Sequence, residues 1–372
     1  MTAPVRPAPR TAPRTARLLA CVLVVALALL AACGRTPDTT LRPAPVAVTF
    51  APLQRPFAGA RLTVDPKTQA VAWQRAHHAT WLDPITDEPQ ARWLNGFADL
   101  ADVPALLAAS RTQKSLPVLV VYAIPNRGCS NFREGLPYGD YDRPVPRPDS
   151  YAAFVTALVR LLGTTRAVVV LEPDAVPADC FDDARAAMLK GAVNQLVAAG
   201  QYVYLDAGHS GWVPSGDVAQ RLLRSGVDRA EGVSLNVSNR YPTWAAADFG
   251  EELAELVGDR DYIVDTSRNG AADTALDPAS LANDWCNRTD QALGEQRIGT
   301  PDAARWPHLA AQLWIKLPGE SDGNATVFPN QDCHGETAPP GAFSAKQARE
   351  LILNDPRQPD RVRREVRAAV AR

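Results

Sequence analysis

Short apolar runs alternate with longer amphipathic stretches along most of the chain. The apolar runs read as strands and cover residues 61–64, 91–94, 118–124, 167–171, 202–205, 231–237, 262–264 and 311–316. Between them lie Ala- and Leu-rich stretches in which apolar residues recur every three or four positions, for example 151–162, 182–199 and 217–225. This spacing predicts helices. This alternation predicts a parallel sheet with helices outside it. Residues 357–372 are charged and Ala-rich, and we expect a surface helix or a frayed tail there.

Polar side chains follow several of these strands at the point where each strand ends. The run 167–171 leads into Glu172, Pro173 and Asp174. Four further strand ends are followed by the polar segments 125–129, 206–212, 265–268 and 316–323. Because the carboxyl ends of parallel strands meet at one edge, these acids, cations and tryptophans should converge on one rim, where α/β barrels place their catalytic groups.

The amino terminus reads as an export signal. Four arginines precede an apolar stretch at 18–32, which is too short to span a membrane comfortably. The stretch ends in Leu-Ala-Ala-Cys-Gly at 30–34, typical of a bacterial lipobox, in which Cys33 is lipidated and becomes the new amino terminus. The alternative is an ordinary cleavage site with an incidental cysteine.

The chain is therefore expected to contain three parts. Residues 1–32 form a lipoprotein signal peptide, 33–55 a Pro- and Thr-bearing tether too poor in apolar residues to fold, and 56–372 one catalytic domain. We expect a secreted protein that is anchored by Cys33 to the outer face of the bacterial membrane. No other membrane contact is expected.

Charge narrows the class of partner. The net charge is -2, and no basic run occurs beyond the amino terminus, so a nucleic acid partner is not expected. A neutral polymer such as a glucan fits this balance better, and we expect a monomer.

Cysteine usage agrees with export. With Cys21 in the signal and Cys33 lipidated, four cysteines remain at positions 129, 180, 286 and 333. An even set of four allows three disulfide pairings. A zinc site is the alternative, but the short Cys-x-x-Cys spacing of such sites is missing.

Four motifs carry a resemblance to a known family. They are Tyr-Leu-Asp-Ala-Gly-His-Ser-Gly-Trp at 204–212, Asn-Val-Ser-Asn at 236–239, Asp-Trp-Cys-Asn at 284–287, and 314–323 beginning Trp-Ile-Lys. In combination they resemble glycoside hydrolase family 6, from about Pro56 to the region of Leu353. The resemblance implies a distorted, incomplete TIM-like parallel β/α barrel with loops forming a cleft. It also implies inverting hydrolysis of β-1,4-glucosidic bonds in cellulose or a related β-glucan, without metal or organic cofactor.

The resemblance also assigns residues. It pairs Cys129 with Cys180 and Cys286 with Cys333. Asp174 matches the general acid, Asp322 the base or its electrostatic substitute, and Asp206 a supporting carboxylate. Structural alternatives are a helix N-cap for Asp174, an ion pair for Asp322 and a buried hydrogen-bonding role for Asp206. Arg268 and Lys316 would keep Asp322 ionised, and Arg127 is a supporting residue.

Sugar binding requires flat apolar platforms beside polar groups, because a pyranose ring has C–H groups on its faces and hydroxyls on its edge. The residues that the resemblance places in sugar subsites are Trp93, Tyr122, Trp212 and Trp285, with His209, Asn236, Lys316 and Glu320 bonding hydroxyls. For the remaining tryptophans that we considered, Trp73, Trp81, Trp244 and Trp306, we expect core packing.

One position departs from the family. Members usually carry Asp before the first disulfide cysteine, where it supports protonation of the acid, but this chain has Gly128. Loss of that charge should lower the pKa of the acid. Glu134, Asp140 and Asp142 are candidates for the vacant role. The rival hypothesis is a surface glycan-binding lipoprotein with weak or lost catalysis, and a further option is hydrolysis of another β-glucan of the cell envelope.

Overall fold

A computed structural model describes residues 48–127, 129, 148–271, 285–328 and 332–370. The chain divides after Val48, and the folded unit lies within Thr49–Arg372. None of the helices in the described part of the chain is long and apolar enough to cross a membrane.

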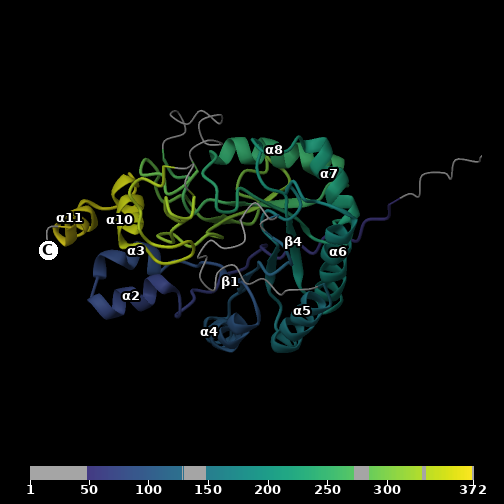
Figure 1. The fold of residues 1–372 in the computed structure, drawn as a ribbon, viewed down its shortest axis with the longest axis horizontal. Helices are drawn as coiled ribbons and strands as arrows, with labels where there is room; N and C mark the ends of the chain where they lie inside the picture. The colour runs from purple at the N-terminus through teal and green to yellow at the C-terminus, as the bar shows by residue number, and fades with distance from the viewer. Residues whose placement is uncertain (1–47, 128, 130–147, 272–284, 329–331, 371–372) are drawn as a thin grey trace, which may run out of the picture. The chain divides into compact units, whose positions relative to one another are not determined.

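A curled sheet of eight strands forms the centre of this unit (Figure 1). The strands are β1 (Arg92–Leu94), β2 (Val118–Val121), β3 (Val168–Leu171), β4 (Tyr202–Asp206), β5 (Gly232–Leu235), β6 (Asp261–Asp265), β7 (Arg297–Ile298) and β8 (Leu309–Leu313). Their order is β1-β2-β3-β4-β5-β6-β8-β7. All neighbours are parallel except β7, which runs antiparallel to β8.

The described residues form several helices. They are α2 (Gln69–His77), α3 (Asp83–Thr86), α4 (Val103–Gln113), α5 (Pro148–Leu162), α6 (Asp183–Ala198), α7 (Ser215–Arg224), α8 (Thr243–Leu256), α10 (Ala345–Asn354) and α11 (Asp360–Val370), with 3-10 turns at Thr80–Leu82 and Phe97–Asp102. Of these, α4 to α8 each connect two neighbouring parallel strands and cover the outside of the sheet. In Figure 1, α4 to α8 follow one another around the strands, while α2, α3, α10 and α11 lie together at the left of the view.

Both faces of the sheet are buried, which explains the continuous apolar runs in the sequence. Along β2, Val118 and Val120 belong to an inner cluster with Tyr204 and Ile263 from other strands. The alternate side chains, such as Leu119, pack outward against the helices. A third apolar cluster lies among α2, α10 and α11.

The barrel is incomplete, as the resemblance implied. Strands β1 and β7 stand at the two edges of the sheet. The two ends of the sheet are linked where the backbone N–H of Ala91 donates to the carbonyl of Trp314 over 3.0 Å. The indole N–H of Trp93 donates to the carbonyl of Ile315 over 2.7 Å. These contacts bring β1 beside the segment that follows β8.

Two expectations are wrong, one about a strand and one about the burial of a tryptophan. Residues 61–64 form no strand, because Leu62 makes only an isolated bridge to Leu116, and Pro66 just beyond lacks an N–H to continue a ladder. Trp244 was expected in the core but is 37% exposed, whereas Trp81 and Trp306 are buried as expected. Trp73 is partly buried, with its ring against Trp81 and Phe343. The sequence pattern did not predict β7.

Two helix glycines test how tightly α8 packs on the sheet. A Cβ added at Gly250 would lie 2.6 Å from the ring of Tyr262, whereas one at Gly191 in α6 meets nothing within 4 Å. Gly250→Ala should therefore reduce the free energy of unfolding by about 1–3 kcal/mol. Gly191→Ala should raise it by about 0.5–1 kcal/mol, because alanine loses less backbone entropy in a helix. Denaturant unfolding measures both, and equal stabilisation by both changes would contradict the packing.

Candidate active site

The loop after β3 holds Asp174 in an unusual backbone conformation. Glu172 and Asp174 have φ angles of 52° and 72°, in the left-handed region that non-glycine residues rarely adopt. The loop is fixed from both sides: the carboxylate of Glu172 accepts the backbone N–H groups of Ala123 and Ile124, and the N–H of Asp174 donates to Asp206 over 2.9 Å. Strain of this kind, held by surrounding hydrogen bonds, often accompanies functional sites.

Asp174 does not cap a helix. The next helix, α6, begins at Asp183, and its cap is Asp182, whose side chain accepts the N–H of Arg185 over 2.7 Å. Burial raises the pKa of the Asp174 carboxyl to about 6, although a hydrogen bond from Tyr122 and the charges of Lys316 and Arg127 act to lower it. This carboxyl therefore retains a proton at mildly acidic pH.

Asp206 ends β4 and is a buried neighbour of Asp174, with 1% of its surface exposed. Its carboxyl accepts the N–H groups of Asp174 and Gly208 and lies 3.1 Å from the hydroxyl of Ser234. Burial first, and then the negative charge of Asp174, raises the pKa of Asp206 to about 8. Because two buried carboxylates would repel each other, the pair holds at least one proton near neutral pH.

Asp322 has the opposite electrostatic environment. Arg240 and Arg268 donate to its two carboxylate oxygens over 2.7 and 2.8 Å, and the N–H of Asn287 adds a bond of 3.0 Å. Burial would raise the pKa of Asp322, but the charges of Arg240, Arg268 and Lys316 outweigh it and hold the pKa well below the usual range. Asp322 is therefore a fixed anion. Arg240 was not identified from the sequence, since it stands outside the motifs and reaches Asp322 only in the fold.

Lys316 and Glu320 form a buried ion pair on the loop after β8. The ammonium of Lys316 lies 5.5 Å from the ring centre of Trp93. Trp93 in turn meets Tyr122 edge to face at 5.4 Å. The guanidinium of Arg127 stacks over the ring of Tyr122 at 4.3 Å. The structure thus brings these predicted residues together next to Asp174.

A second aromatic group lies on the loop after β4. His209 stacks on Tyr241 with ring centres 4.4 Å apart, and Trp212 lies 5.6 Å from His209. Burial lowers the pKa of His209 to about 4, so its imidazole is neutral at physiological pH. Trp212 is 39% exposed. Trp285 is partly buried, and its ring meets Phe328 edge to face at 4.8 Å.

Asn236 differs from its expected sugar-binding role. Its side chain is fully buried. The amide donates to the carbonyls of Tyr241 and Asp265, and its oxygen accepts the N–H of Tyr241. These internal bonds use the polar groups of Asn236, so its visible role is to fix the loop after β5.

Two further carboxylates organise the rim without having been assigned a role from the sequence. Glu172 joins the loops after β2 and β3, as described above. Asp265, at the end of β6, accepts the backbone N–H groups of Ser238, Ser267, Ile315 and Lys316, and so joins three loops. Their position directly at strand ends was the available signal, but only the fold shows that their partners are backbone groups.

Both expected disulfides are confirmed. Cys129 pairs with Cys180, and Cys286 with Cys333, with Cα separations of 5.4 and 4.8 Å. They close loops with sequence separations of 51 and 47 residues, and each contributes up to about 4 kcal/mol by loop-closure entropy. Cys286 precedes Asn287, the partner of Asp322. Gly128, Glu134, Asp140, Asp142, Cys21 and Cys33 lie outside the described residues.

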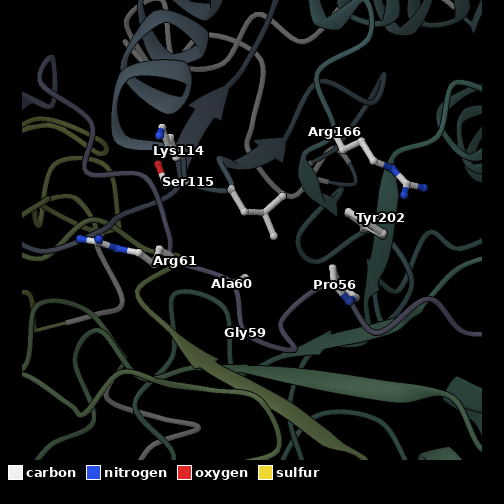
Figure 2. Close-up of a pocket in the computed structure, with 9 residues that line it drawn as sticks. Pro56, Gly59, Ala60, Arg61, Lys114, Ser115, Arg166 and Tyr202 are labelled. Carbon is white, nitrogen blue, oxygen red and sulfur yellow. The ribbon is translucent and has the colours of Figure 1, made fainter.

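A cavity of about 350 Å³ lies at the other end of the strands (Figure 2). Its lining consists of Pro56, Gly59, Ala60, Arg61, Lys114, Ser115, Leu116, Arg166 and Tyr202. Tyr202 is the first residue of β4, so this cavity stands at the amino-terminal side of the sheet. Figure 2 shows the Arg61 and Arg166 side chains extending away from each other. The cavity contains none of the rim residues.

Comparison with known proteins gives consistent relationships. Residues 57–355 match the model of the family described as glycosyl hydrolases family 6. The chain is 35% identical over 275 residues to endoglucanase A of Cellulomonas fimi, covering 70% of this chain and 56% of that protein. It is 31% identical over 310 residues to endoglucanase A of Thermobispora bispora, covering 78% of this chain and 61% of that protein. The chain thus spans less than two thirds of the length of these two relatives.

A solved structure extends the relationship to the fold. The endoglucanase Cel6 from Mycobacterium tuberculosis, determined with a methyl-cellobiosyl-4-deoxy-4-thio-β-D-cellobioside, is 32% identical. It aligns with a TM-score of 0.69 over 81% of this chain and 99% of that one. The family match across most of the folded unit, together with this likeness in sequence and backbone, shows that the chain belongs to family 6 of the glycosyl hydrolases.

Proposed function

We propose that this protein hydrolyses β-1,4-glucosidic bonds of cellulose or a related β-glucan, with inversion at the anomeric carbon. The observation that carries the proposal is a pair of rim carboxyls with opposed ionisation: the pKa of Asp174 is raised, and that of Asp322 is lowered. Glycoside hydrolysis uses one protonated and one ionised carboxyl in this way. The names of the related endoglucanases support the same reaction.

Asp174 is assigned as the general acid. It donates its proton to the glycosidic oxygen as the bond from that oxygen to the anomeric carbon breaks, while water attacks the carbon from the opposite face and releases one proton to the surrounding water. Asp322 faces the developing positive charge on the sugar. Its low pKa makes it a weak proton acceptor, since both oxygens are held by arginines. We therefore assign Asp322 an electrostatic role rather than that of a strong base.

Asp206 is assigned a supporting role, because its carboxyl accepts the backbone N–H of Asp174 and so holds the acid in place. Burial and the neighbouring carboxyl are enough to keep a proton on the Asp174–Asp206 pair. Burial also raises the pKa of Asp174 itself to about 6, without any charge at position 128. This favours an active hydrolase over the binding-only rival that Gly128 suggested.

The sugar platforms are assigned to the aromatic residues of the rim. Trp93, Tyr122, Trp212 and Trp285 offer ring faces or edges to pyranose C–H groups, while neutral His209 and the Lys316–Glu320 pair bond hydroxyls. We leave Asn236 out of this set, since its amide is used within the protein.

We further propose export and lipid anchoring at Cys33. The two disulfides are typical of proteins that fold in an oxidising compartment outside the cytoplasm. The small residues before Cys33 support processing at that cysteine.

The acid assignment predicts the effect of Asp174→Asn. The amide holds no transferable proton, so release of reducing ends from soluble cellulose should fall at least about 100-fold. Asp217→Asn, at an exposed position of α7, is the matched control and should retain parental activity. Other envelope β-glucans should be assayed in parallel to find the preferred polymer. Equal release by Asp174→Asn and the parent would leave only the binding function.

The hydrogen bond from Tyr122 predicts a shift in the pH profile. The acid must be protonated, so kcat/KM should fall as pH rises through the Asp174 pKa of about 6. The bond favours the carboxylate, and Tyr122→Phe removes it, so the pKa of Asp174 should rise and the alkaline limb should move up by about 0.5–1 pH. Tyr202→Phe, at the far end of the strands, should leave the limb in place. A downward move for Tyr122→Phe would refute this assignment.

Lipidation at Cys33 predicts fractionation behaviour. In a bacterial host with lipoprotein processing, the parent should partition with membranes and incorporate labelled palmitate. Cys33→Ser should lose both properties because the acceptor thiol is gone, whereas Cys21→Ser should keep them. Unchanged membrane partition and labelling of Cys33→Ser would exclude the anchor.

A further inference from the structure

Two exposed tryptophans follow neighbouring strands of the sheet. Among the residues that the structure describes, the tryptophans with large exposed fractions are Trp212 at 39% and Trp244 at 37%. Trp212 follows the carboxyl end of β4, and Trp244 follows that of β5, its neighbour in the sheet. Single exposed apolar side chains are ordinary, but two exposed tryptophans in the segments that follow neighbouring strands of a binding rim point to a common ligand.

The two loops are packed into one body. His209 and Tyr241 stack between them at 4.4 Å, and each tryptophan comes three residues after one ring of this stack. The N–H of Asn236 donates to the carbonyl of Gly208 over 2.8 Å. A Cβ on Gly211 would lie 2.1 Å from the hydroxyl of Tyr241, so only glycine allows this approach. The positions of the two indoles are therefore linked through the stack.

The position of Trp244 at the start of α8 places it at the rim end of this helix. It is the second residue of α8, whose buried face is formed by other side chains, including Phe249 and Leu253. In a helix the Cα–Cβ bond tilts toward the amino terminus, so a side chain covers the turn before its own position. For Trp244 that turn is the junction with β5, at the end of the strands where Asp206 and Asp174 lie.

The start of α8 is also held rigidly. The amide of Asn269, on the loop after β6, donates to the carbonyl of Tyr241 over 3.0 Å and to the hydroxyl of Thr243 over 3.1 Å. A platform whose backbone is fixed before binding loses less entropy when a ligand stacks on it.

We infer that Trp244 is an additional stacking platform for the glucan chain, beyond Trp212 in the direction from β4 to β5. The ligand is the same β-1,4-glucan as in the proposed function, on which this inference rests. A short oligosaccharide that occupies the site around Asp174 does not reach Trp244, whereas a polymer chain does. Trp244 therefore contributes to affinity for long substrates and not to the chemical step.

Binding measured without turnover tests the inference. Every variant carries Asp174→Asn, so that the glucan is not degraded. Trp244→Ala should weaken affinity for soluble hydroxyethyl cellulose, measured by affinity electrophoresis, by about three- to tenfold. Its affinity for cellotriose, measured by calorimetry, should not change. Trp244→Tyr should restore most of the polymer affinity, because a flat ring is present again.

Leu256→Ala is the matched control, since it removes an apolar side chain that is 48% exposed at the far end of the same helix. It should leave both affinities unchanged, and thermal unfolding confirms that each variant is folded. Parental affinity of Trp244→Ala for the polymer overturns the inference and leaves the hydrolase proposal standing. An equal loss for cellotriose and polymer also overturns it. Absence of glucan binding in the Asp174→Asn parent overturns the inference and the proposed function together.

Discussion

The chemistry of this rim depends on how buried carboxyl groups are compensated. Removing a carboxylate from water is costly, and the partner it meets decides which form is kept. Asp265 meets four backbone N–H groups and remains a structural acceptor. Asp322 meets two arginines and remains an anion. For Asp174 burial outweighs the opposing charges of Lys316 and Arg127, and for Asp206 burial is the largest contribution, so the protonated forms of both carboxyls are favoured.

The sheet makes these different environments possible within one site. Asp206 and Asp265 end β4 and β6, Asp174 follows shortly after β3, and Asp322 lies on the loop that follows β8. The parallel register of β3 to β6 and β8 brings these strand ends to one edge. Backbone groups of neighbouring loops then serve as hydrogen-bond donors. The backbone groups that hold the loops together thereby also change the pKa of the carboxyls. Loop packing and proton affinity are therefore coupled.

Gly128 bears on how the proposed acid keeps its proton. Members of the resembled family usually place a carboxylate there, and its loss suggested an under-protonated acid. Burial of Asp174 supplies a separate cause for a raised pKa of its carboxyl. A site in which desolvation is the largest contribution tolerates the loss of one charge better than a site that relies on charge repulsion alone.

The sequence by itself determined the α/β class, most of the strands, the rim acids and the four half-cystines, because these follow from local periodicity and from motifs at strand ends. It did not determine that 61–64 fails to extend a ladder or that the Asn236 amide is used internally. Nor did it identify Arg240 as the second partner of Asp322, since these two residues are 82 positions apart. The exposure of Trp244 was missed as well, because a large apolar side chain is expected in the core when only the sequence is known. Only tertiary structure decides such points: burial and pairing depend on which distant segments meet, and local patterns carry no information about those meetings.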